Sequence, residues 1–168
     1  FAYHLATRTP RVRAVLLVLV MLPFWSNFLV RTYAWRVLLG SDGPLIGLLG
    51  ALGIDDVVLL FTPFAIVLGL VYGFLPFMVL PLYAAIERID HTLIEAARDL
   101  HASGWGAFRA VTLPLSRSGV IAGSVLVFIP AFGAYVTPEL LGGSRTTMIG
   151  SYVVRQFLSA RDWPFGSA

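Results

Sequence analysis

Few residues in this sequence have the types and spacing that catalysis or metal binding requires. His91 and Glu95 lie four positions apart, so a helix would place them on one face, where an imidazole and a carboxylate can share a metal ion. A third ligand is missing, and a solvated helix face is the better explanation. Ser116 and Ser118 flank an apolar run, without a G-x-S-x-G turn or a matching histidine and acid. We therefore expect no catalytic residue, no metal site and no cofactor.

The positive charge of the chain comes entirely from arginine. Twelve arginines balance nine acidic residues to a net charge of +3, and most of the arginines flank apolar segments. Nucleic-acid-binding proteins gather their charge on one face, so that many phosphates are neutralised together. The sequence therefore predicts no nucleic-acid partner. It also contains no cysteine, which excludes disulfides and cysteine-ligated zinc or iron–sulfur sites.

Most of the chain is expected to lie in lipid. Hydrophobic residues make up 58% of the chain and charged residues 12%, with a mean hydropathy of +0.83. A soluble domain has about 45–50% apolar and about 25% charged residues. Because only helices and closed barrels satisfy their backbone in a bilayer, we expect an all-α membrane protein, a polytopic transmembrane helix bundle with about three full spans.

Three apolar stretches approach or reach the roughly 20 residues that a helix needs to cross a bilayer. The first covers residues 14–30, is interrupted near Asn27, and is expected to continue to Leu39; the second covers 57–86 and the third 119–138. The second carries three prolines, so we expect tilt and bending. Small residues in the third stretch would let helix backbones approach closely. They are Gly119, Ala122, Gly123, Ala131 and Gly133.

The placement of arginines predicts the orientation of the chain. Arginines at positions 8, 11 and 13 precede the first apolar stretch, and short cytoplasmic loops retain positive charge. Residues 1–13 and 87–117 are therefore expected to face the cytoplasm, and residues 41–56 and 140–168 the outside. The chain begins on an apolar stub and stops at Ala168, so residues 1–168 are interpreted as a fragment of a single transmembrane domain whose flanking spans are missing.

The second and third apolar stretches contain no charged residue. A transporter with its own proton relay would bury ionisable groups at mid-membrane, because such groups are costly there and usually functional. The energy for transport is therefore expected to come from a partner. A channel or secondary transporter and a structural membrane scaffold remain as alternatives.

The 87–117 loop has the pattern of two short amphipathic helices. Thr92 with Glu95 three residues later forms a capping-box pattern, with Asp90 as a rival N-cap. One helix face would carry apolar residues in a regular repeat. They are Ile89, Leu93, Ala96, Ala97 and Leu100. A turn at residues 101–104 leads to a second segment, residues 105–114.

These residues resemble the E-A-A loop of binding-protein-dependent ABC importer permeases, whose membrane domains are of type I. The resemblance rests on Glu95-Ala96-Ala97, the turn and Val111-Thr112-Leu113-Pro114. In that family the loop docks into the cytoplasmic ATPase, which implies a coupling role for six residues: Glu95, Ala96, Ala97, His101, Leu113 and Pro114. The family usually has glycine where His101 stands. Histidine is among the residues that tolerate positive φ, so we expect the turn to survive.

Further motifs resemble spermidine/putrescine permeases. They are Leu22-Pro23-Phe24-Trp25-Ser26-Asn27, Arg31-Thr32-Tyr33-Ala34-Trp35, residues 75–83, residues 138–143 and Asp162-Trp163-Pro164-Phe165-Gly166. The resemblance implies a multi-pass protein of the bacterial inner membrane that works with cytoplasmic ATP-binding subunits, a second permease subunit and an external substrate-binding protein. Related permeases for iron, thiosulfate or opines are the alternative within the same family.

A polyamine cation would be recognised by aromatic faces and carboxylates. Four residues in or near the outer halves of the spans fit this requirement: Trp25, Tyr33, Trp35 and Glu139. Tryptophan and tyrosine are also enriched at membrane interfaces for reasons unrelated to a substrate. Glu139, which follows Pro138 at the end of a span, can equally cap external structure.

Overall fold

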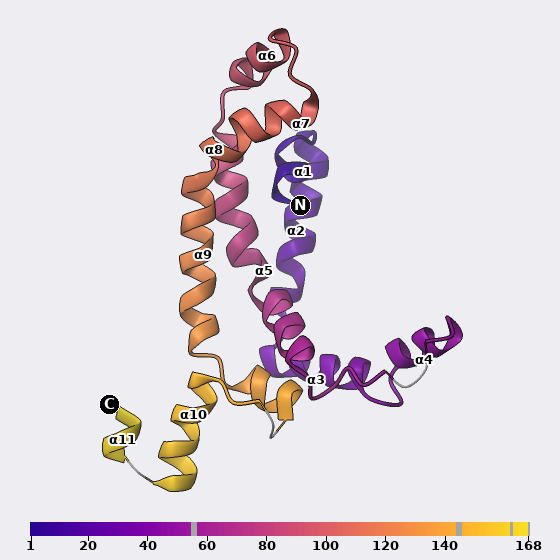
Figure 1. The fold of residues 1–168 in the computed structure, drawn as a ribbon, viewed down its shortest axis with the longest axis vertical. Helices are drawn as coiled ribbons and strands as arrows, with labels where there is room; N and C mark the ends of the chain where they lie inside the picture. The colour runs from indigo at the N-terminus through magenta and orange to yellow at the C-terminus, as the bar shows by residue number, and fades with distance from the viewer. Residues whose placement is uncertain (55–56, 144–145, 162, 168) are drawn as a thin grey trace. The chain divides into compact units, whose positions relative to one another are not determined.

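The computed structural model describes residues 1–54, 57–143, 146–161 and 163–167, so Asp162 of the last motif lies outside it. Every regular element among the described residues is a helix (Figure 1). The first part of the chain contains α1 (Ala2–Ala6), α2 (Pro10–Met21), the 3₁₀ turn η1 (Leu22–Trp25), α3 (Phe28–Leu39), α4 (Pro44–Ala51) and α5 (Pro63–Glu87). The 87–117 loop contains α6 (His91–Asp99), α7 (Gly104–Ala107), the π-helix η2 (Phe108–Thr112) and α8 (Leu113–Leu115). They are followed by α9 (Arg117–Phe132), the π-helices η3 (Pro138–Gly142) and η5 (Gln156–Ala160), α10 (Ile149–Arg155) and α11 (Trp163–Ser167).

One helix of the described chain, α5, is by itself long and apolar enough to cross a membrane. It has 25 residues, of which an 18-residue stretch reaches a mean hydropathy of 2.2, and Pro76 and Pro81 lie within the helix. Two bent pairs satisfy the same criterion if each is taken as one span: residues 10–25 with 28–51, and residues 104–115 with 117–132. The described chain therefore has one to three candidate spans, which agrees with the expected all-helical membrane fold.

The first apolar stretch forms two helices, which are divided at the interruption expected near Asn27. Helix α2 ends at Met21, and a new helix begins after Asn27, whose side-chain oxygen accepts a hydrogen bond of 2.8 Å from the Leu29 amide. Pro23 lies within the intervening 3₁₀ turn. An asparagine N-cap satisfies an amide that would otherwise lack a partner, so the residues that interrupt the hydrophobic pattern also end the helix.

The third stretch also differs from its expected bounds. Helix α9 covers Arg117–Phe132, so it starts two residues earlier than the predicted stretch and ends six residues before Pro138. Residues 133–135 are not helical, and Pro138 begins η3 instead of closing the span. Apolar character alone does not show where α9 ends, because residues 133–138 continue the run without a charged residue.

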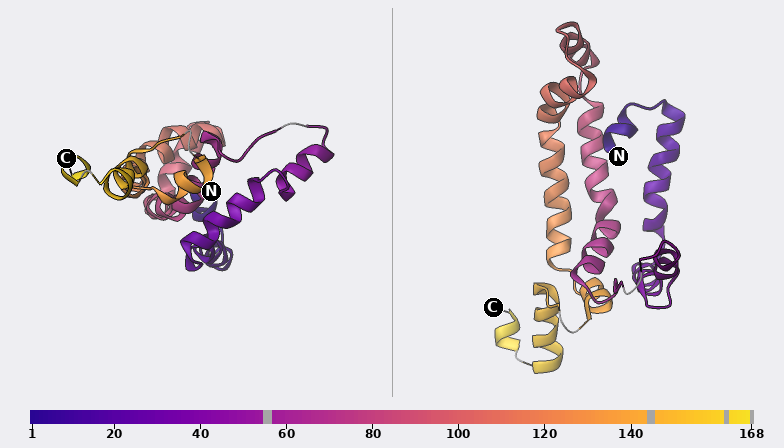
Figure 2. Two further views of the ribbon diagram at one scale, coloured as in Figure 1. Left: turned by 90° about the horizontal axis from the view of Figure 1, so that it is seen from below. Right: turned by 45° about the vertical axis from the view of Figure 1, so that its right-hand side comes forward.

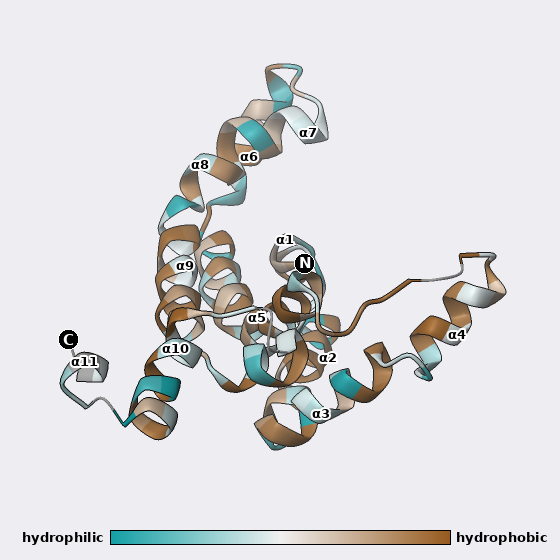
Figure 3. Ribbon diagram, turned by 60° about the horizontal axis from the view of Figure 1, so that its bottom comes forward, coloured by the Kyte–Doolittle hydropathy of each residue, from teal (hydrophilic) through white to brown (hydrophobic). Residues whose placement is uncertain are grey.

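The chain divides into two compact units. Unit 1 comprises residues 1–23 and 75–128, and within it α9 and α2 lie on opposite sides of the C-terminal half of α5 (Figure 2). Its core consists of the buried side chains of Ala2, Leu5 and Val79. The α6–α8 segment follows the end of α5 and leads into α9. Figure 3 shows hydrophobic residues along most of α9 and a mixture of hydrophilic and hydrophobic residues in α6–α8.

Two glycines allow α9 to approach α5 closely within unit 1. A Cβ atom placed on Gly119 would lie 2.5 Å from the Cβ of Ala85 and 2.8 Å from the carbonyl oxygen of Pro81. A Cβ on Gly123, one turn further on, would lie 2.7 Å from the Met78 sulfur. Such small residues four positions apart form the usual close-packing motif of membrane helices. Gly133, expected to act in the same way, has no atom within 4 Å of the point where a Cβ would lie.

Unit 2 comprises residues 24–74 and 129–168 and has its own core. The buried side chains of Leu39, Ala65 and Leu141 bring together α3, the N-terminal half of α5 and η3. The Phe61 amide donates a hydrogen bond of 2.8 Å to the Leu141 carbonyl, which joins the entry to α5 with η3.

Candidate functional site

The N-cap of helix α6 is Asp90, which takes the place of the expected Thr92–Glu95 capping box. The Asp90 carboxylate oxygen Oδ1 accepts a hydrogen bond of 2.9 Å from the Thr92 amide, and the backbone of Asp90 is extended. Thr92 lies one residue inside the helix, so the capping-box prediction is wrong and the rival N-cap is confirmed. The reason is local, because the chain leaves α5 at Glu87 and must begin a new helix within three residues.

The cap also sets the charge state of Asp90. Hydrogen bonds from the Thr92 backbone amide and then from the Thr92 side chain favour the carboxylate, which holds the pKa of Asp90 below its usual value. A lowered pKa means that the stabilisation of the helix start is present above the unfolded-state pKa. It is lost only as the pH falls through the lower folded-state pKa. The cap is therefore intact throughout the neutral range.

Helix α6 ends in a Schellman turn closed by His101. The His101 amide donates to the Arg98 carbonyl at 2.8 Å, and the Ala102 amide donates to the Ala97 carbonyl at 3.1 Å. His101 itself has φ of +65°, the left-handed conformation that this turn requires at the residue after the C-cap. The prediction that histidine would support a positive-φ turn here is confirmed.

The second half of the 87–117 loop is a continuous helical segment made of α7, η2 and α8. It starts at Ser103, whose hydroxyl oxygen accepts a hydrogen bond of 3.1 Å from the Gly106 amide. Three aromatic rings connect this segment to α1 within unit 1. Trp105 stacks on Phe108 at a centroid distance of 5.3 Å, and Phe108 meets the ring of Tyr3 edge-on at 5.2 Å. The loop therefore rests on α1 as well as on the ends of α5 and α9.

An ion pair supports the loop at its root. The Arg13 guanidinium donates to the Glu87 carboxylate at 2.6 Å, which links the first turns of α2 to the last residue of α5. Beside it lies a cavity of about 260 Å³ whose lining includes Thr7, Ile94 and Thr112. Thr112 is almost completely buried, and Ile89, which precedes α6, is 8% exposed. The base of the loop is therefore packed into unit 1.

The outer face of the loop, in contrast, carries uncovered apolar side chains. Leu100 is 84% exposed and Trp105 is 71% exposed, and Leu93 is also exposed. The predicted apolar stripe of α6 is thus divided, because Ile89 packs inward while Leu93 and Leu100 do not. Large exposed apolar groups at the tip of a packed segment are typical of a surface that another protein covers.

The six predicted coupling residues are not gathered at one point. Glu95 and Ala96 are exposed on α6, Ala97 is half-buried, and His101 closes the same helix. Leu113 and Pro114 are exposed on α8, where the loop joins α9, and the Leu113 carbonyl accepts a hydrogen bond of 3.1 Å from the Ser116 hydroxyl. Four of the residues therefore belong to one helix and its turn, and two to the exit of the loop.

The four candidate substrate residues all belong to unit 2 but do not form one site. Trp35 meets Tyr72 edge-on at 5.4 Å and lines a small cavity of about 10 Å³, roughly the size of one water molecule. Trp25 is 83% exposed on η1, and Tyr33 is exposed on α3. Within the described residues, only Trp35 of the four lines this cavity.

Glu139, the one carboxylate among these candidates, is already paired. Its oxygen Oε2 lies 3.2 Å from the Arg155 guanidinium, so η3 and α10 are joined by a partly exposed ion pair. A cationic substrate would have to compete with Arg155 for this group. Within the described chain, no group of three or more histidine, aspartate or glutamate side chains is placed to hold a metal ion.

Residues 2–164 of the chain match the family of binding-protein-dependent transport system inner membrane components. The chain belongs to this family. It is 46% identical over its whole length to the spermidine/putrescine transport system permease protein PotB of Escherichia coli K12, of which it covers 62%. The identity to the protein of the same name from Haemophilus influenzae is also 46%, with 59% of that protein covered. The inner membrane ABC transporter permease protein YdcU of E. coli is 33% identical over 99% of the chain, which covers 58% of YdcU.

This chain therefore spans about three fifths of the length of these curated relatives. As a member of the family it is an inner-membrane transport component.

Sequence reasoning missed several contacts that support the 87–117 loop, namely the contact between the rings of Tyr3 and Phe108 and the Arg13–Glu87 ion pair. The ion pair could have been inferred, because the predicted topology already put both charged residues at the same membrane surface. The aromatic contacts left no periodic signal.

Proposed function

We propose that this chain is part of the permease of an ATP-driven importer and that its 87–117 loop receives the force of a cytoplasmic ATPase. The family to which the chain belongs is binding-protein-dependent, which supports partnership with an external binding protein and with ATP-binding subunits. A second permease subunit would complete the membrane domain. The coupling residues would be Glu95, Ala96, Ala97 and His101 on α6, with Leu113 and Pro114 at the exit.

The observation that carries this proposal is the contrast between the two sides of the loop. Its base is fixed by the Arg13–Glu87 ion pair and by buried Ile89, whereas its tip exposes Leu100 and Trp105. A channel or a scaffold has no need for a rigid segment with an uncovered apolar tip. A segment that must transmit a push or pull needs both features, because a soft base would absorb the displacement.

The mechanism follows from the elements that the loop joins. Helix α6 directly follows α5, and α8 leads into α9, so a displacement of the loop reaches two apolar helices at once. Gly119 and Gly123 keep these helices in close contact, which favours their movement as a pair. ATP binding and hydrolysis in the partner would then alternate access to a pathway in the membrane domain.

The solute that we propose is a polyamine. The two PotB relatives, at 46% identity over the whole chain, are spermidine/putrescine permeases by name. Trp25, Tyr33 and Trp35 are the aromatic candidates for contact with the cation, and Glu139 would contribute only by exchanging Arg155 for substrate. Iron, thiosulfate and opines are the alternative solutes.

The test uses the full-length protein assembled with its ATPase, second permease and binding protein in proteoliposomes. We expect uptake of labelled putrescine or spermidine, and ATPase stimulation by the polyamine-loaded binding protein. Stimulation by an iron- or thiosulfate-loaded binding protein, with none by polyamines, would keep the importer and change its solute. Uptake that does not depend on ATP would overturn the importer itself.

A further inference from the structure

Phe61 has a backbone conformation that a bulky residue rarely adopts. Its φ is +60°, in the left-handed region, where a residue with a Cβ atom is strained. His101 and Arg161 also have positive φ in the described chain, but each lies just after a helical segment, where a left-handed residue is common. Phe61 instead precedes Thr62, whose hydroxyl oxygen accepts a hydrogen bond of 3.3 Å from the Ala65 amide near the start of α5. The end of a helix therefore does not explain its conformation.

The ring of Phe61 meets a second unusual conformation at the end of η3. Gly143 has φ of +63° and ψ of −160°, a combination almost confined to glycine. A Cβ atom on Gly143 would lie 2.8 Å from the ring atom Cδ1 of Phe61, so the missing side chain makes room for the ring. The Phe61 amide also donates a hydrogen bond of 2.8 Å to the Leu141 carbonyl. The entry to α5 and the end of η3, both in unit 2, are thus joined at two points.

Arg36 of α3 attaches to the same ring. Its guanidinium carbon lies 5.8 Å from the centroid of the Phe61 ring, a distance at which a cation is attracted to an aromatic face. Phe61 is 48% exposed, so burial of the ring in a core does not hold it in place. The strained conformation is therefore maintained by the attachments to Arg36, Leu141 and Gly143.

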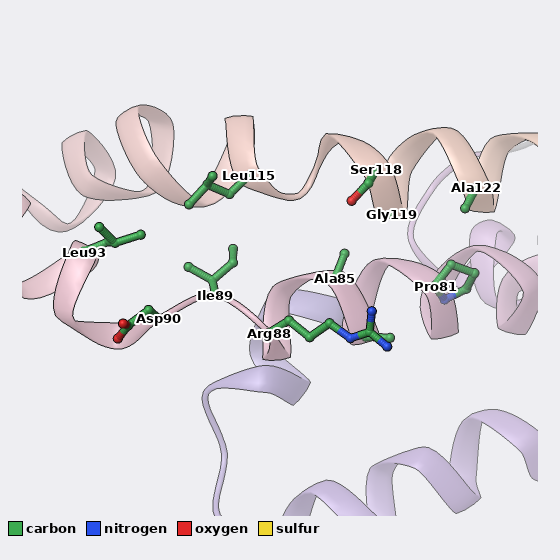
Figure 4. Close-up of a pocket in the computed structure, with 11 residues that line it drawn as sticks. Pro81, Ala85, Arg88, Ile89, Asp90, Leu93, Leu115, Ser118, Gly119 and Ala122 are labelled. Atoms are coloured by element: carbon green, nitrogen blue, oxygen red, sulfur yellow. The ribbon is translucent and has the colours of Figure 1, made fainter.

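Close packing by itself does not produce such strain in this chain. At the other end of α5, within unit 1, Gly119 of α9 lies beside Ala85 along a groove of about 550 Å³ (Figure 4). None of the described residues that line this groove has a positive φ. Strained residues persist only where their surroundings hold them, and they cluster in segments that switch between two arrangements. The Phe61 contact has the properties of such a segment.

We propose that Phe61 is a strained clasp between α3, the entry to α5 and the end of η3, and that the clasp opens and closes during transport. On opening, the Phe61 amide leaves the Leu141 carbonyl, φ returns to the ordinary negative region, and the ring leaves Arg36. The relief of backbone strain offsets part of the lost attraction, so the two states lie close in free energy and a small shift of η3 can change their populations. The movement rests on the proposed import cycle and is independent of the solute.

The test measures hydrogen exchange of the residue-61 amide in the full-length protein within its assembled transporter in nanodiscs. Nucleotide-free transporter is compared with transporter held by a non-hydrolysable ATP analogue. We expect the protection of this amide to differ about tenfold between the two states, the size of effect that one strained residue can produce. Equal protection would overturn the clasp, whether or not uptake depends on ATP. Solute uptake by the same transporter in proteoliposomes identifies a failure of the importer proposal separately.

Two variants at position 61 test the strain. Phe61→Gly and Phe61→Ala both remove the ring and its attraction to Arg36, but only glycine adopts a φ of +60° without strain. The residue-61 amide should therefore be about fivefold more protected in Phe61→Gly than in Phe61→Ala, after correction for the intrinsic exchange rates of the two sequences. Equal protection in the two variants would mean that the backbone stores no strain and would overturn the proposal.

Variants of the attached residues test what holds the clasp closed. Arg36→Gln leaves the backbone unchanged and should lower the protection of the residue-61 amide severalfold, whereas Arg36→Lys, which keeps the cation, should restore it. Gly143→Ala should lower protection further, because its Cβ meets the ring. Gly53→Ala is the matched control, since Gly53 has φ of +78° but no atom within 4 Å of the added methyl group, and it should leave this protection unchanged. Native protection in Arg36→Gln would overturn the proposal even if Gly143→Ala did not assemble.

Discussion

His101 carries the turn that ends α6 at a conformational cost. A non-glycine residue in the left-handed region costs about 1 kcal/mol or more, and histidine is only one of the better-tolerated residues. His101→Gly should therefore keep the Schellman turn and slow amide exchange of α6 in the full-length protein, with transport unchanged or increased. Hydrogen exchange of residues 91–102 measures the first effect, and solute uptake the second.

A β-branched residue provides the opposing control at the same position. His101→Val should accelerate exchange in α6, because valine fits poorly at a φ of +65°. If the glycine variant exchanged faster than the native protein, the imidazole would be contributing a stabilising contact, and the backbone explanation would be wrong.

Gly119 offers a second prediction at the residue scale. Gly119→Ala places a methyl group 2.5 Å from the Ala85 Cβ and 2.8 Å from the Pro81 carbonyl oxygen, so α9 must move away from α5. We expect a loss of about 1–3 kcal/mol in the free energy of unfolding, the usual cost of overpacking. Denaturant unfolding of the purified full-length protein in detergent measures it.

Gly133→Ala is the matched control, because nothing lies within 4 Å of that position. It should change the unfolding free energy by a few tenths of a kcal/mol, within the range of a neutral surface change. Equal losses in the two variants would mean that the cost reflects glycine flexibility and not the contact between α9 and α5.

Among the elements, α5 could be predicted from hydropathy and the 87–117 loop from its motif, whereas helix ends could not. Most of the uninterrupted apolar run of residues 57–86 forms α5, which begins only at Pro63, and the break expected near Asn27 divides α2 from α3. Hydropathy misplaced the end of α9, because the uncharged run continues through residues 133–138 after the helix has ended. The sequence offered both Thr92 and Asp90 as the N-cap of α6. The choice between them depends on how the chain leaves α5, which the capping-box pattern does not show.

In the candidate sites, the types of the residues could be predicted from the sequence, but their contacts could not. The periodicity of α6 predicted an apolar helix face. The inward packing of Ile89, however, depends on α1 and α5, and the sequence of the loop carries no information about where those helices lie. The aromatic and acidic types that suit a polyamine identified Trp35 and Glu139. Their actual neighbours, Tyr72 and Arg155, lie in other helices and follow only from the tertiary fold.

The coupling role of α6 leads to a prediction at the scale of elements. Ala97→Arg introduces a long charged side chain on a helix whose neighbours Ala96 and Leu100 are exposed, so the partner surface can no longer approach closely. Transport and ATPase binding should fall strongly, while membrane insertion persists because the loop lies outside the apolar helices. In the full-length protein, solute uptake measures transport, co-purification measures ATPase binding, and membrane fractionation measures insertion.

Ala51→Arg, at an exposed position of α4, is the control for the added charge and should transport normally. If Ala97→Arg bound its ATPase and transported like the control, the 87–117 loop would not be the coupling element.

For the whole molecule, the ion pair between Arg13 and Glu87 agrees with the predicted topology. Arg13 lies near the start of α2 and Glu87 at the end of α5, so their contact at 2.6 Å puts the beginning of one apolar segment beside the end of another. If both segments cross the bilayer, they run in opposite directions, and residues 1–13 share a membrane surface with the 87–117 loop.

This arrangement predicts which parts of the full-length protein a reagent outside the cell can reach. The described chain has no cysteine, so single cysteines at positions 42 and 98 can be introduced at exposed sites, if the remaining cysteines of the full-length protein are removed first. An impermeant thiol reagent applied to whole cells should label position 42 and leave position 98 unlabelled, because arginine-flanked segments stay in the cytoplasm. Permeabilised cells should show labelling at both positions, which controls for access. Labelling of position 98 but not 42 in intact cells would reverse the orientation, place the 87–117 loop away from any cytoplasmic ATPase, and remove the physical basis for the coupling mechanism.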